Sequence, residues 1–585
     1  MQHLISAPIV DLIAAELGIE AATVRDQIGP PRRPDAGDLA LPCFRLAQAA
    51  GCPPPQLATR LAALVNQGVT GCQAEAAGPF LNLRLDPALV ASVLLPRLME
   101  EPLTPLRPAV GCGTVCIDFS SPNIAKHLAY HHIRSTMIGN ALAHCYAAAG
   151  WRVVRINFLG DWGTAFGRLI AGWKREDLSL ADLEQAADPV GFLNALYVRI
   201  SRAAEADPAI MEEARAWSVR LEQGDAEARG LWQVFKDASL GAFRRIYDLL
   251  GVDFDSWKGE AYYEDKMQGT LDELHSSGLL VEDDGALVVD LQDQGMEKPC
   301  LIRRADGGTL YATRDLCACE DRYREFAFDR CLYVVDLGQS LHFKEWFAVA
   351  RKLGKPYADR LRHVAFGVVL MWSEEDQAYV KGRTRAGGAI LLADVLAEAI
   401  ARAGSIIADK NPDLDETTRQ AVAQAVGVGA VVFNDLKSNR KNDVKFRFDD
   451  ALAMQGDTGP YLQYTHARLC SIERRGAEDG CASGPIDPGL LVRDDEKQVL
   501  LAITSLTQAL LDTVEHDEPS RLASALLNLA GTTSSWLTAG TRDPQARVIG
   551  PDPACSATRI ALVRAVREAL GEGLHLLGLE APERM

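Results

Sequence analysis

The sequence predicts an α/β protein in three parts: a small α/β module, a larger domain built on a parallel sheet, and an all-α C-terminal part. Two apolar strand patterns, at residues 113–120 and 151–160, enclose a helical stretch, which indicates a right-handed βαβ unit with parallel strands. Residues from about 172 to 260 have helical spacing and form an insertion. From about residue 390 onward strand signals nearly vanish and apolar residues recur with the period of an α-helix, which predicts a helical bundle.

The chain of 585 residues is long enough for several domains with separate cores. We expect the first domain at residues 1–105, where an amphipathic helix and a strand pattern precede a proline-rich linker. The second domain is expected at 106–400, with the helical insertion at about 172–260. The third, α-helical domain is expected at 401–585.

Composition and cysteine spacing favour a cytoplasmic protein with no membrane segment and no structural zinc. No apolar run reaches transmembrane length, and Asp11 and Glu16 lie where a signal peptide would be apolar. The thirteen cysteines include no CxxC pair, which argues against zinc ribbons and against a disulfide framework. We expect Cys317 and Cys319, the single CxC pair, to be small core residues rather than metal ligands.

The net charge of −18 says little about nucleic-acid binding, because exposed charges are screened beyond about 10 Å. The basic stretch 437–447 is either a solvated face or a local contact for phosphates. The charge of the whole chain does not choose between these alternatives.

Residues 118–140 join the end of a strand to a polar turn and the start of a helix. Pro122 ends the strand, and Ser121 and Asn123 offer side-chain hydrogen bonds in the turn. Helix N-termini at the carboxyl ends of parallel strands attract phosphate. We therefore predict a nucleoside triphosphate site, which is neither a P-loop nor a dinucleotide fingerprint. The polar side chains expected in the first turns of the helix are Lys126, His132, Arg134, Ser135 and Thr136.

The sequences SPNIAK at 121–126 and IRST at 133–136 resemble the first signature of class I aminoacyl-tRNA synthetases, specifically the arginyl-tRNA synthetases. The family carries His-x-Gly-His between these two pieces. Here His132 matches the last histidine, whereas Ala129 and His131 stand at the first histidine and the glycine. The sequence GDWGTAFG at 160–167 is similar to the family's GDWGTQFG. The resemblance covers essentially the whole chain, and implies a Rossmann-type catalytic domain, an N-terminal domain that contacts tRNA, and an all-α anticodon-binding bundle.

The resemblance also implies a site for L-arginine. Tyr311 and Asp315 are spaced i and i+4, so a helix would place both on one face, where a carboxylate and a phenol suit a planar cation. In the family these two positions bind the guanidinium group. Gln339 and Asn123 would contact the backbone end of the amino acid, and Asp118 and Ser121 would complete the pocket.

For ATP, the resemblance implies Lys126, His132, Lys381 and Arg383. The last two lie in KGRTRAGG at 381–388, where class I enzymes carry a mobile loop that closes on the phosphates; Arg383 replaces a lysine there. Lys126 would then supply the missing ammonium, so Lys126, His132 and Arg383 are the expected catalytic residues. No residue is assigned to a metal, and Mg²⁺ is expected to accompany ATP.

Residues 456–472 are similar to the anticodon-binding helix of the family. Tyr461, Tyr464 and Arg468 share a face at helical spacing, where aromatic rings can stack on unpaired bases. A tyrosine pair at this spacing otherwise packs in a core. The resemblance favours tRNA binding, and places Met585 near the anticodon site.

Two functions remain open. One is a monomeric arginine–tRNA ligase that forms arginyl-adenylate from L-arginine and ATP and transfers arginine to the 3′ end of tRNA(Arg). The other is a non-catalytic paralogue that acts as a tRNA-binding or regulatory protein. Ala129 removes one hydrogen-bond donor, which typically costs about 3 kcal/mol, and an imidazole at 131 crowds the adenine or stacks with it. The residues expected to bind L-arginine and tRNA are retained, which favours the working enzyme.

Overall fold

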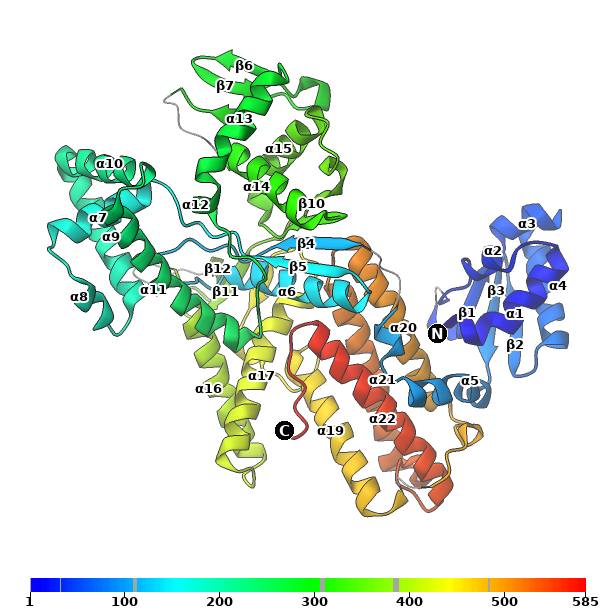
Figure 1. Ribbon diagram of the computed structural model, residues 1–585. Coiled ribbons are helices and arrows are strands. Elements are labelled where there is room, and N and C mark those ends of the chain that lie inside the picture. Colours follow the sequence, from blue (N-terminus) through cyan, green and yellow to red (C-terminus); the bar gives the residue numbers. More distant parts are fainter. Residues whose placement is uncertain (1, 32, 109–112, 306–310, 382–388, 482–483) are drawn as a thin grey trace.

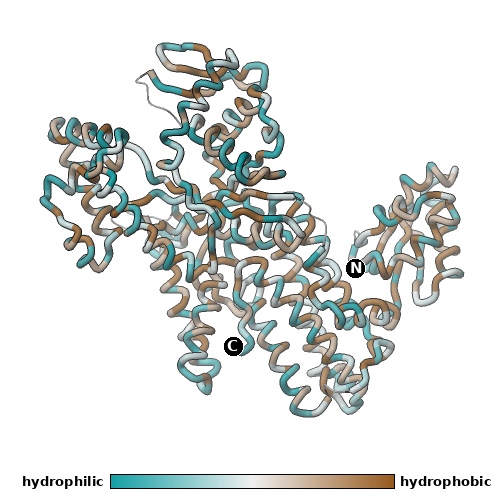
Figure 2. Tube along the Cα trace, viewed as in Figure 1, coloured by the Kyte–Doolittle hydropathy of each residue, from teal (hydrophilic) through white to brown (hydrophobic). Residues whose placement is uncertain are grey.

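The computed structural model describes residues 2–31, 33–108, 113–305, 311–381, 389–481 and 484–585. Figure 1 shows a central parallel sheet with two insertions beside and above it, a helical bundle below, and an N-terminal module to one side. In Figure 2 apolar residues follow the central strands and the bundle helices, while the turn between the helices α16 (Leu392–Lys410) and α17 (Glu416–Leu436) is hydrophilic. This architecture confirms the predicted fold class.

The N-terminal module is a three-stranded antiparallel sheet of order β1-β3-β2 covered by helices. The alternation in FLNLRL buries Leu81, Leu83 and Leu85 on one face, as a half-buried strand requires. The elements are α1 (Gln2–Leu17), α2 (Ala21–Arg25), β1 (Leu39–Pro42), α3 (Phe44–Ala50), α4 (Pro54–Gly68), β2 (Cys72–Ala77), β3 (Phe80–Leu85) and α5 (Pro87–Glu100).

A buried ion pair joins this module to the helical bundle. Lys497, only 2% exposed, donates to Asp38 Oδ2 at 3.0 Å and to the carbonyl oxygen of Leu85 at 3.1 Å. Lys497 lies in α20 (Asp494–His516), against which α5 packs. The Lys497 ammonium group therefore holds the N-terminal module against the helical bundle.

The central sheet has the order β10-β9-β4-β5, and all its pairings are parallel. Its strands are β4 (Thr114–Asp118), β5 (Arg152–Ile156), β9 (Arg330–Tyr333) and β10 (Leu361–His363). The predicted βαβ unit is confirmed, because α6 (His132–Ala148) connects β4 to β5. The chain adds β5 on one side of β4 and β9 on the other, so the strand order reverses there, and ligands bind at such a reversal.

Two insertions extend from this core. The helical one, to the left in Figure 1, contains α7 (Thr164–Arg175), α8 (Leu180–Glu184), α9 (Pro189–Ala206), α10 (Pro208–Glu222) and α11 (Ala226–Leu250). Above the sheet lie α12 (Glu260–Tyr263), α13 (Met267–Ser276), β6 (Leu280–Asp283), β7 (Ala286–Val289) and β8 (Cys300–Arg303), whose strands form an antiparallel sheet. The helices α14 (Tyr311–Phe326) and α15 (Ser340–Lys352) pack beside each other. Cys317 and Cys319 are buried, as predicted for core residues.

One strand lies within 401–585, where we predicted only helices, and at 444–446 that prediction is wrong. β13 (Val444–Phe446) pairs in parallel with β11 (Val369–Ser373), which also pairs with β12 (Ala378–Lys381). Val444 and Phe446 are buried against the catalytic part, so the chain returns to it before the bundle continues. A three-residue strand has too short a pattern to stand out in the sequence.

The bundle is made of long helices with apolar inner faces and of the short helix α18 (Phe448–Ala451). The long helices are α16, α17, α19 (Gly459–Glu478), α20, α21 (Ser520–Arg542) and α22 (Pro553–Leu576). Within the described ranges, no helix is both long and apolar enough to span a bilayer.

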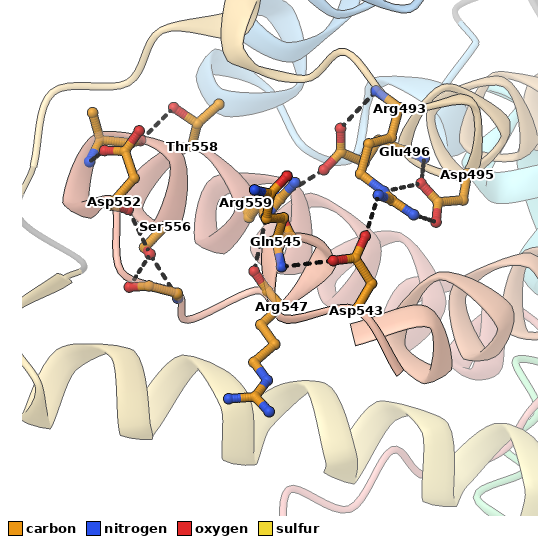
Figure 3. A network of polar contacts seen from close by, with 12 residues as sticks. Arg493, Asp495, Glu496, Asp543, Gln545, Arg547, Asp552, Ser556, Thr558 and Arg559 are labelled. Atoms are coloured by element: carbon orange, nitrogen blue, oxygen red, sulfur yellow. Dashed lines mark hydrogen bonds and ion pairs between the residues drawn. The ribbon is translucent and has the colours of Figure 1, made fainter. Parts of the chain in front are cut away.

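A polar network joins the start of α20 to the turn between α21 and α22 (Figure 3). Arg559 donates from Nε to Glu496 Oε1 at 2.6 Å and from Nη1 to the carbonyl oxygens of Gln545 and Arg547 at 2.6 and 2.9 Å. Glu496 and Arg559 are both buried. One guanidinium group thus satisfies a buried carboxylate and two carbonyls.

Replacing Arg559 with methionine is expected to destabilise the bundle by about 3–5 kcal/mol, because Glu496 would keep a buried, unpaired charge. Urea unfolding followed by circular dichroism measures this change. The control is Arg547→Ala, because the exposed Arg547 side chain points away from the network in Figure 3. Equal unfolding midpoints for the two variants would contradict the assignment.

Candidate active site

The signature segment leaves β4 through a strained turn. Ser120 and Ser121 have φ values of 69° and 46°, a left-handed backbone that side chains other than glycine rarely adopt. Hydrogen bonds hold this turn: the Ser120 N–H donates to Ser135 Oγ at 2.8 Å, and the Ser121 hydroxyl donates to Asp118 Oδ1 at 2.8 Å. The turn thereby aims Ser121 across the carboxyl end of the sheet.

The helix after this turn begins later than predicted. α6 starts at His132, and Lys126 lies six positions earlier, in the connecting turns. The Lys126 ammonium lies 5.8 Å from the centre of the Tyr197 ring in α9, and His127 Nε2 lies 2.8 Å from Asp188 Oδ2. The prediction that Lys126 lies in the first turn of the helix is therefore wrong, because the chain continues through turns to residue 131, with Ile124, Leu128 and Tyr130 buried, before α6 begins.

A cavity of about 780 Å³ opens at the carboxyl ends of β4 and β9, the place expected of a ligand site in this topology. Among the residues that line it are Ser121, His131, His132, Asp336 and Lys381. Its volume suits an adenine nucleotide. The structure thus brings together Ser121, His132 and Lys381, which the sequence predicted for the site.

The two adjacent histidines form a stacked pair at the start of α6. Their ring centres are 4.2 Å apart, and His132 Nδ1 lies 3.0 Å from both the N and the O of Ala129. Burial, and to a smaller degree His131, lowers the pKa of His132 to about 4; burial also lowers the pKa of His131. At neutral pH both rings are uncharged, so they can hydrogen-bond to phosphate but add no positive charge.

Arg134 builds a wall of the cavity instead of facing a phosphate. It is 1% exposed, and its Nε lies 2.9 Å from Asp435 Oδ1. Its Nη1 donates to the carbonyl oxygens of Gly367 at 2.7 Å and Asn442 at 2.9 Å. Burial raises the pKa of Asp435, while Arg134 opposes that rise. Arg134 does lie in the first turn of α6, as predicted, but its guanidinium group is bound inside the protein.

Both described ends of the stretch 381–389 reach the cavity. Lys381 is the last residue of β12, and Ala389 is the first described residue after it. Both residues line the cavity. The Tyr130 N–H donates to the carbonyl oxygen of Ile390 at 2.8 Å, which ties this end to the signature segment. Arg383 lies outside the described residues.

Asp118 is already paired within the protein. Its Oδ2 accepts a hydrogen bond from Arg322 Nη2 at 2.7 Å, and its Oδ1 accepts from Ser121. Burial raises the pKa of Asp118, with Arg322 opposing the rise. The carboxylate is only 5% exposed, so its visible role is to orient Ser121.

Asn123 lies against the second motif. Asn123 and Gly160 form an isolated parallel β-bridge. A Cβ atom on Gly160 would meet Asn123 Oδ1 at 2.0 Å. The first glycine of GDWGTAFG is therefore needed for this close approach.

Tyr311, Asp315 and Gln339 lie at the starts of the paired helices α14 and α15. Tyr311 and Asp315 share one face of α14, as predicted, and Tyr311 is 67% exposed. Gln339 lies in the exposed turn before α15. The Asp315 carboxylate is not free: His342 Nε2 lies 2.6 Å from its Oδ2.

The expected tRNA-binding residues lie in the bundle, away from the cavity. Tyr461, Tyr464 and Arg468 are on α19, and Tyr464 is 46% exposed. The Tyr461 hydroxyl lies 3.1 Å from Ser534 Oγ, so this ring packs against α21. The carbonyl oxygen of Met585 accepts from Asn411 Nδ2 at 2.7 Å.

The partners that hold the predicted residues lie far from them in the sequence, and sequence periodicity does not identify them. Arg322 holds Asp118, Asp435 holds Arg134, and His342 contacts Asp315. Of these three partners, only His342 could have been found from the sequence, because it follows Gln339 by three positions in the short motif DLGQSLHF.

Comparison with known families covers nearly the whole chain. Residues 108–448 match the family described as tRNA synthetases class I (R), catalytic domain. Residues 1–85 match the arginyl tRNA synthetase N terminal domain, and residues 462–585 match the DALR anticodon binding domain.

Curated relatives and a solved structure agree with these matches. An arginine–tRNA ligase of Exiguobacterium sibiricum is 41% identical over 566 residues, or 96% of each chain. One of Streptococcus equi subsp. equi is 40% identical over 581 residues, or 98% of this chain and 99% of the relative. The arginyl-tRNA synthetase of Thermus thermophilus has a TM-score of 0.80 and 25% identity over the whole of both chains. The names of these relatives favour the working enzyme over a non-catalytic paralogue. The chain therefore belongs to the arginine–tRNA ligase family of class I aminoacyl-tRNA synthetases.

Proposed function

We propose that this protein attaches L-arginine to the 3′ end of tRNA(Arg), and that both chemical steps take place at the cavity between β4 and β9. One observation carries the proposal: the cavity lined by Ser121, His132 and Lys381 opens at the strand reversal where ligands bind. Asp315 and Gln339 lie on the elements that follow β8 and β9.

The first step joins arginine to AMP. A carboxylate oxygen of arginine attacks the α-phosphorus of ATP, and pyrophosphate leaves as the bond to the bridging oxygen breaks. His132 and Lys381 contact the phosphates from the cavity wall. Lys126 and Arg383 add positive charge; the flexible Lys126 stem lets its ammonium leave Tyr197. The residues supply orientation and charge stabilisation, without a covalent intermediate.

Arginine is held by opposite charge and by neutral amides. Asp315 accepts guanidinium N–H bonds and Tyr311 contacts the same group, as one face of α14 allows. Asn123 and Gln339 bind the amino acid's backbone end. Ser121 lies beside them, and Asp118 orients it through their hydrogen bond.

In the second step the terminal ribose hydroxyl of tRNA attacks the arginyl carbonyl carbon, and AMP leaves. The exposed ring of Tyr464 stacks on an anticodon base, with Tyr461, Arg468 and Met585 nearby on the same part of the bundle. In this proposal the helical bundle recognises the anticodon of tRNA, and the chemistry takes place at the central sheet.

Mg²⁺ enters the proposal as the counter-ion of ATP. The described part of the chain contains no cluster of three or more His, Cys, Asp or Glu side chains suited to a metal, so no residue is assigned to the ion. We also propose a monomer that works in the cytoplasm, a reducing compartment suited to its many buried thiols.

The test is incorporation of labelled arginine into total tRNA, with the other amino acids as controls. We expect ATP-dependent incorporation of arginine alone, released by mild base as an ester-linked product. Absence of incorporation, or charging with another amino acid, would overturn the proposal. Gel filtration with light scattering tests the monomer separately.

A further inference from the structure

The carboxylate expected to bind the substrate's guanidinium group has a protein partner. His342 Nε2, in the first turn of α15, lies 2.6 Å from Asp315 Oδ2 in α14. The side chains are 24% and 19% exposed, so the contact is partly shielded from water and open on one side. The distance is that of a strong hydrogen bond to a carboxylate.

The backbone on both sides of this contact is firmly held. Phe343 and Trp346 follow His342 on α15 and are buried in an aromatic cluster with Tyr333. On α14, the buried Thr313 hydroxyl donates to the carbonyl oxygen of Ile302 at 2.7 Å. The imidazole therefore approaches Asp315 from an anchored position.

Arg314 and Arg322, two arginines of α14, are engaged with other carboxylates. Arg314, the neighbour of Asp315 in sequence, lies 3.0 Å from Glu260 and 3.8 Å from Glu264. Arg322, two turns further along α14 and buried, is paired with Asp118. Asp118 is thus neutralised by a fixed charge, whereas the partner of Asp315 is a histidine, which can donate a hydrogen bond while uncharged.

We propose that His342 is a positioning residue for arginine recognition, an inference that rests on the proposed function. Its Nε2–H donates to Asp315 Oδ2 and fixes the rotation of the carboxylate. Oδ1 and the remaining lone pair of Oδ2 then face the guanidinium group. A lysine or arginine at 342 would neutralise the acid, and an aliphatic residue would leave the carboxylate free to rotate. His342 itself does not touch the reacting atoms.

The test compares four variants of the full-length protein in aminoacylation. His342→Leu removes the donor and keeps much of the volume, and His342→Gln keeps an N–H donor at similar reach. Lys344→Gln, at an exposed position of the same helix α15, is the matched control, and Asp315→Ala is the reference for the pocket. KM is measured separately for arginine, ATP and tRNA, together with kcat and the thermal unfolding midpoint. If the leucine variant does not fold, His342→Ala takes its place.

We expect His342→Leu to raise the KM for arginine about 10- to 100-fold, the scale of one charge-assisted hydrogen bond. The KM values for ATP and tRNA should stay within about twofold, and kcat at saturating arginine should change little. His342→Gln should restore arginine binding to within about threefold, and Lys344→Gln should resemble the unmodified protein.

Three results would overturn the inference: an unchanged arginine KM in the donor-less variant, a glutamine variant as impaired as leucine, or a parallel rise in all three KM values. The last would mean that His342 supports only the fold. If Asp315→Ala also leaves arginine KM unchanged, the proposed function of the pocket fails instead. Failure of the inference and failure of the proposed function are thereby distinguished.

Discussion

Replacing Asp315 with alanine is expected to lower kcat/KM for arginine charging by about a thousandfold or more. On the proposed function, the change removes the carboxylate that balances the guanidinium group of arginine, and losing one member of such a pair costs about 2–5 kcal/mol or more. His342 would then present its imidazole to the substrate cation without an acid between them. Aminoacylation at varied arginine concentration measures the effect.

The same variant should keep its affinity for tRNA, because the tRNA contacts assigned to α19 lie in the bundle. Fluorescence titration with tRNA checks this within a factor of two. Asp321→Ala is the matched control on α14, since Asp321 pairs with Lys258, whereas Asp315 contacts His342. Normal charging by the Asp315 variant would remove this residue from the arginine pocket.

Replacing His132 with alanine is expected to lower the rate of adenylate formation by about a hundredfold, the usual effect of losing one preorganised donor. His131→Ala should cost less, about tenfold or below. His132 is the first residue of α6 and is held by Ala129, whereas His131 is more exposed at the same cavity. Pyrophosphate exchange in the presence of tRNA gives both rates. The opposite order would mean that the signature is misaligned.

The pH dependence of this pair follows from burial. With its pKa near 4, below the ordinary 6.5, His132 is neutral from pH 6 to pH 8, so the loss in His132→Ala should be the same at both values. The unfolded chain takes up this proton more readily than the folded protein. The stability contributed by the neutral ring is therefore present above about pH 6.5 and falls as the pH drops towards 4.

Short-range patterns predicted most of the fold. Apolar runs and helical periods located β4, β5 and α19, because the burial of one face sets the spacing of apolar residues. The same logic placed Tyr311 and Asp315 on one face of α14. It failed for Lys126, since the mixed apolar and polar turns at 123–131 carry no period that marks where the helix begins, and for β13, which consists of three residues.

The sequence by itself determined the family signature, the parallel βαβ core and the identities of the candidate arginine and tRNA residues. Only the tertiary structure decided which charges are free to meet a ligand. The sequence predicts Asp118 and Arg134 near the site, yet each forms an ion pair with a residue distant in sequence, Arg322 and Asp435 respectively. Asp315 is joined instead by His342, 27 positions away. Such pairings depend on how strands and helices remote in sequence pack together, and burial then makes an unpaired charge too costly to leave.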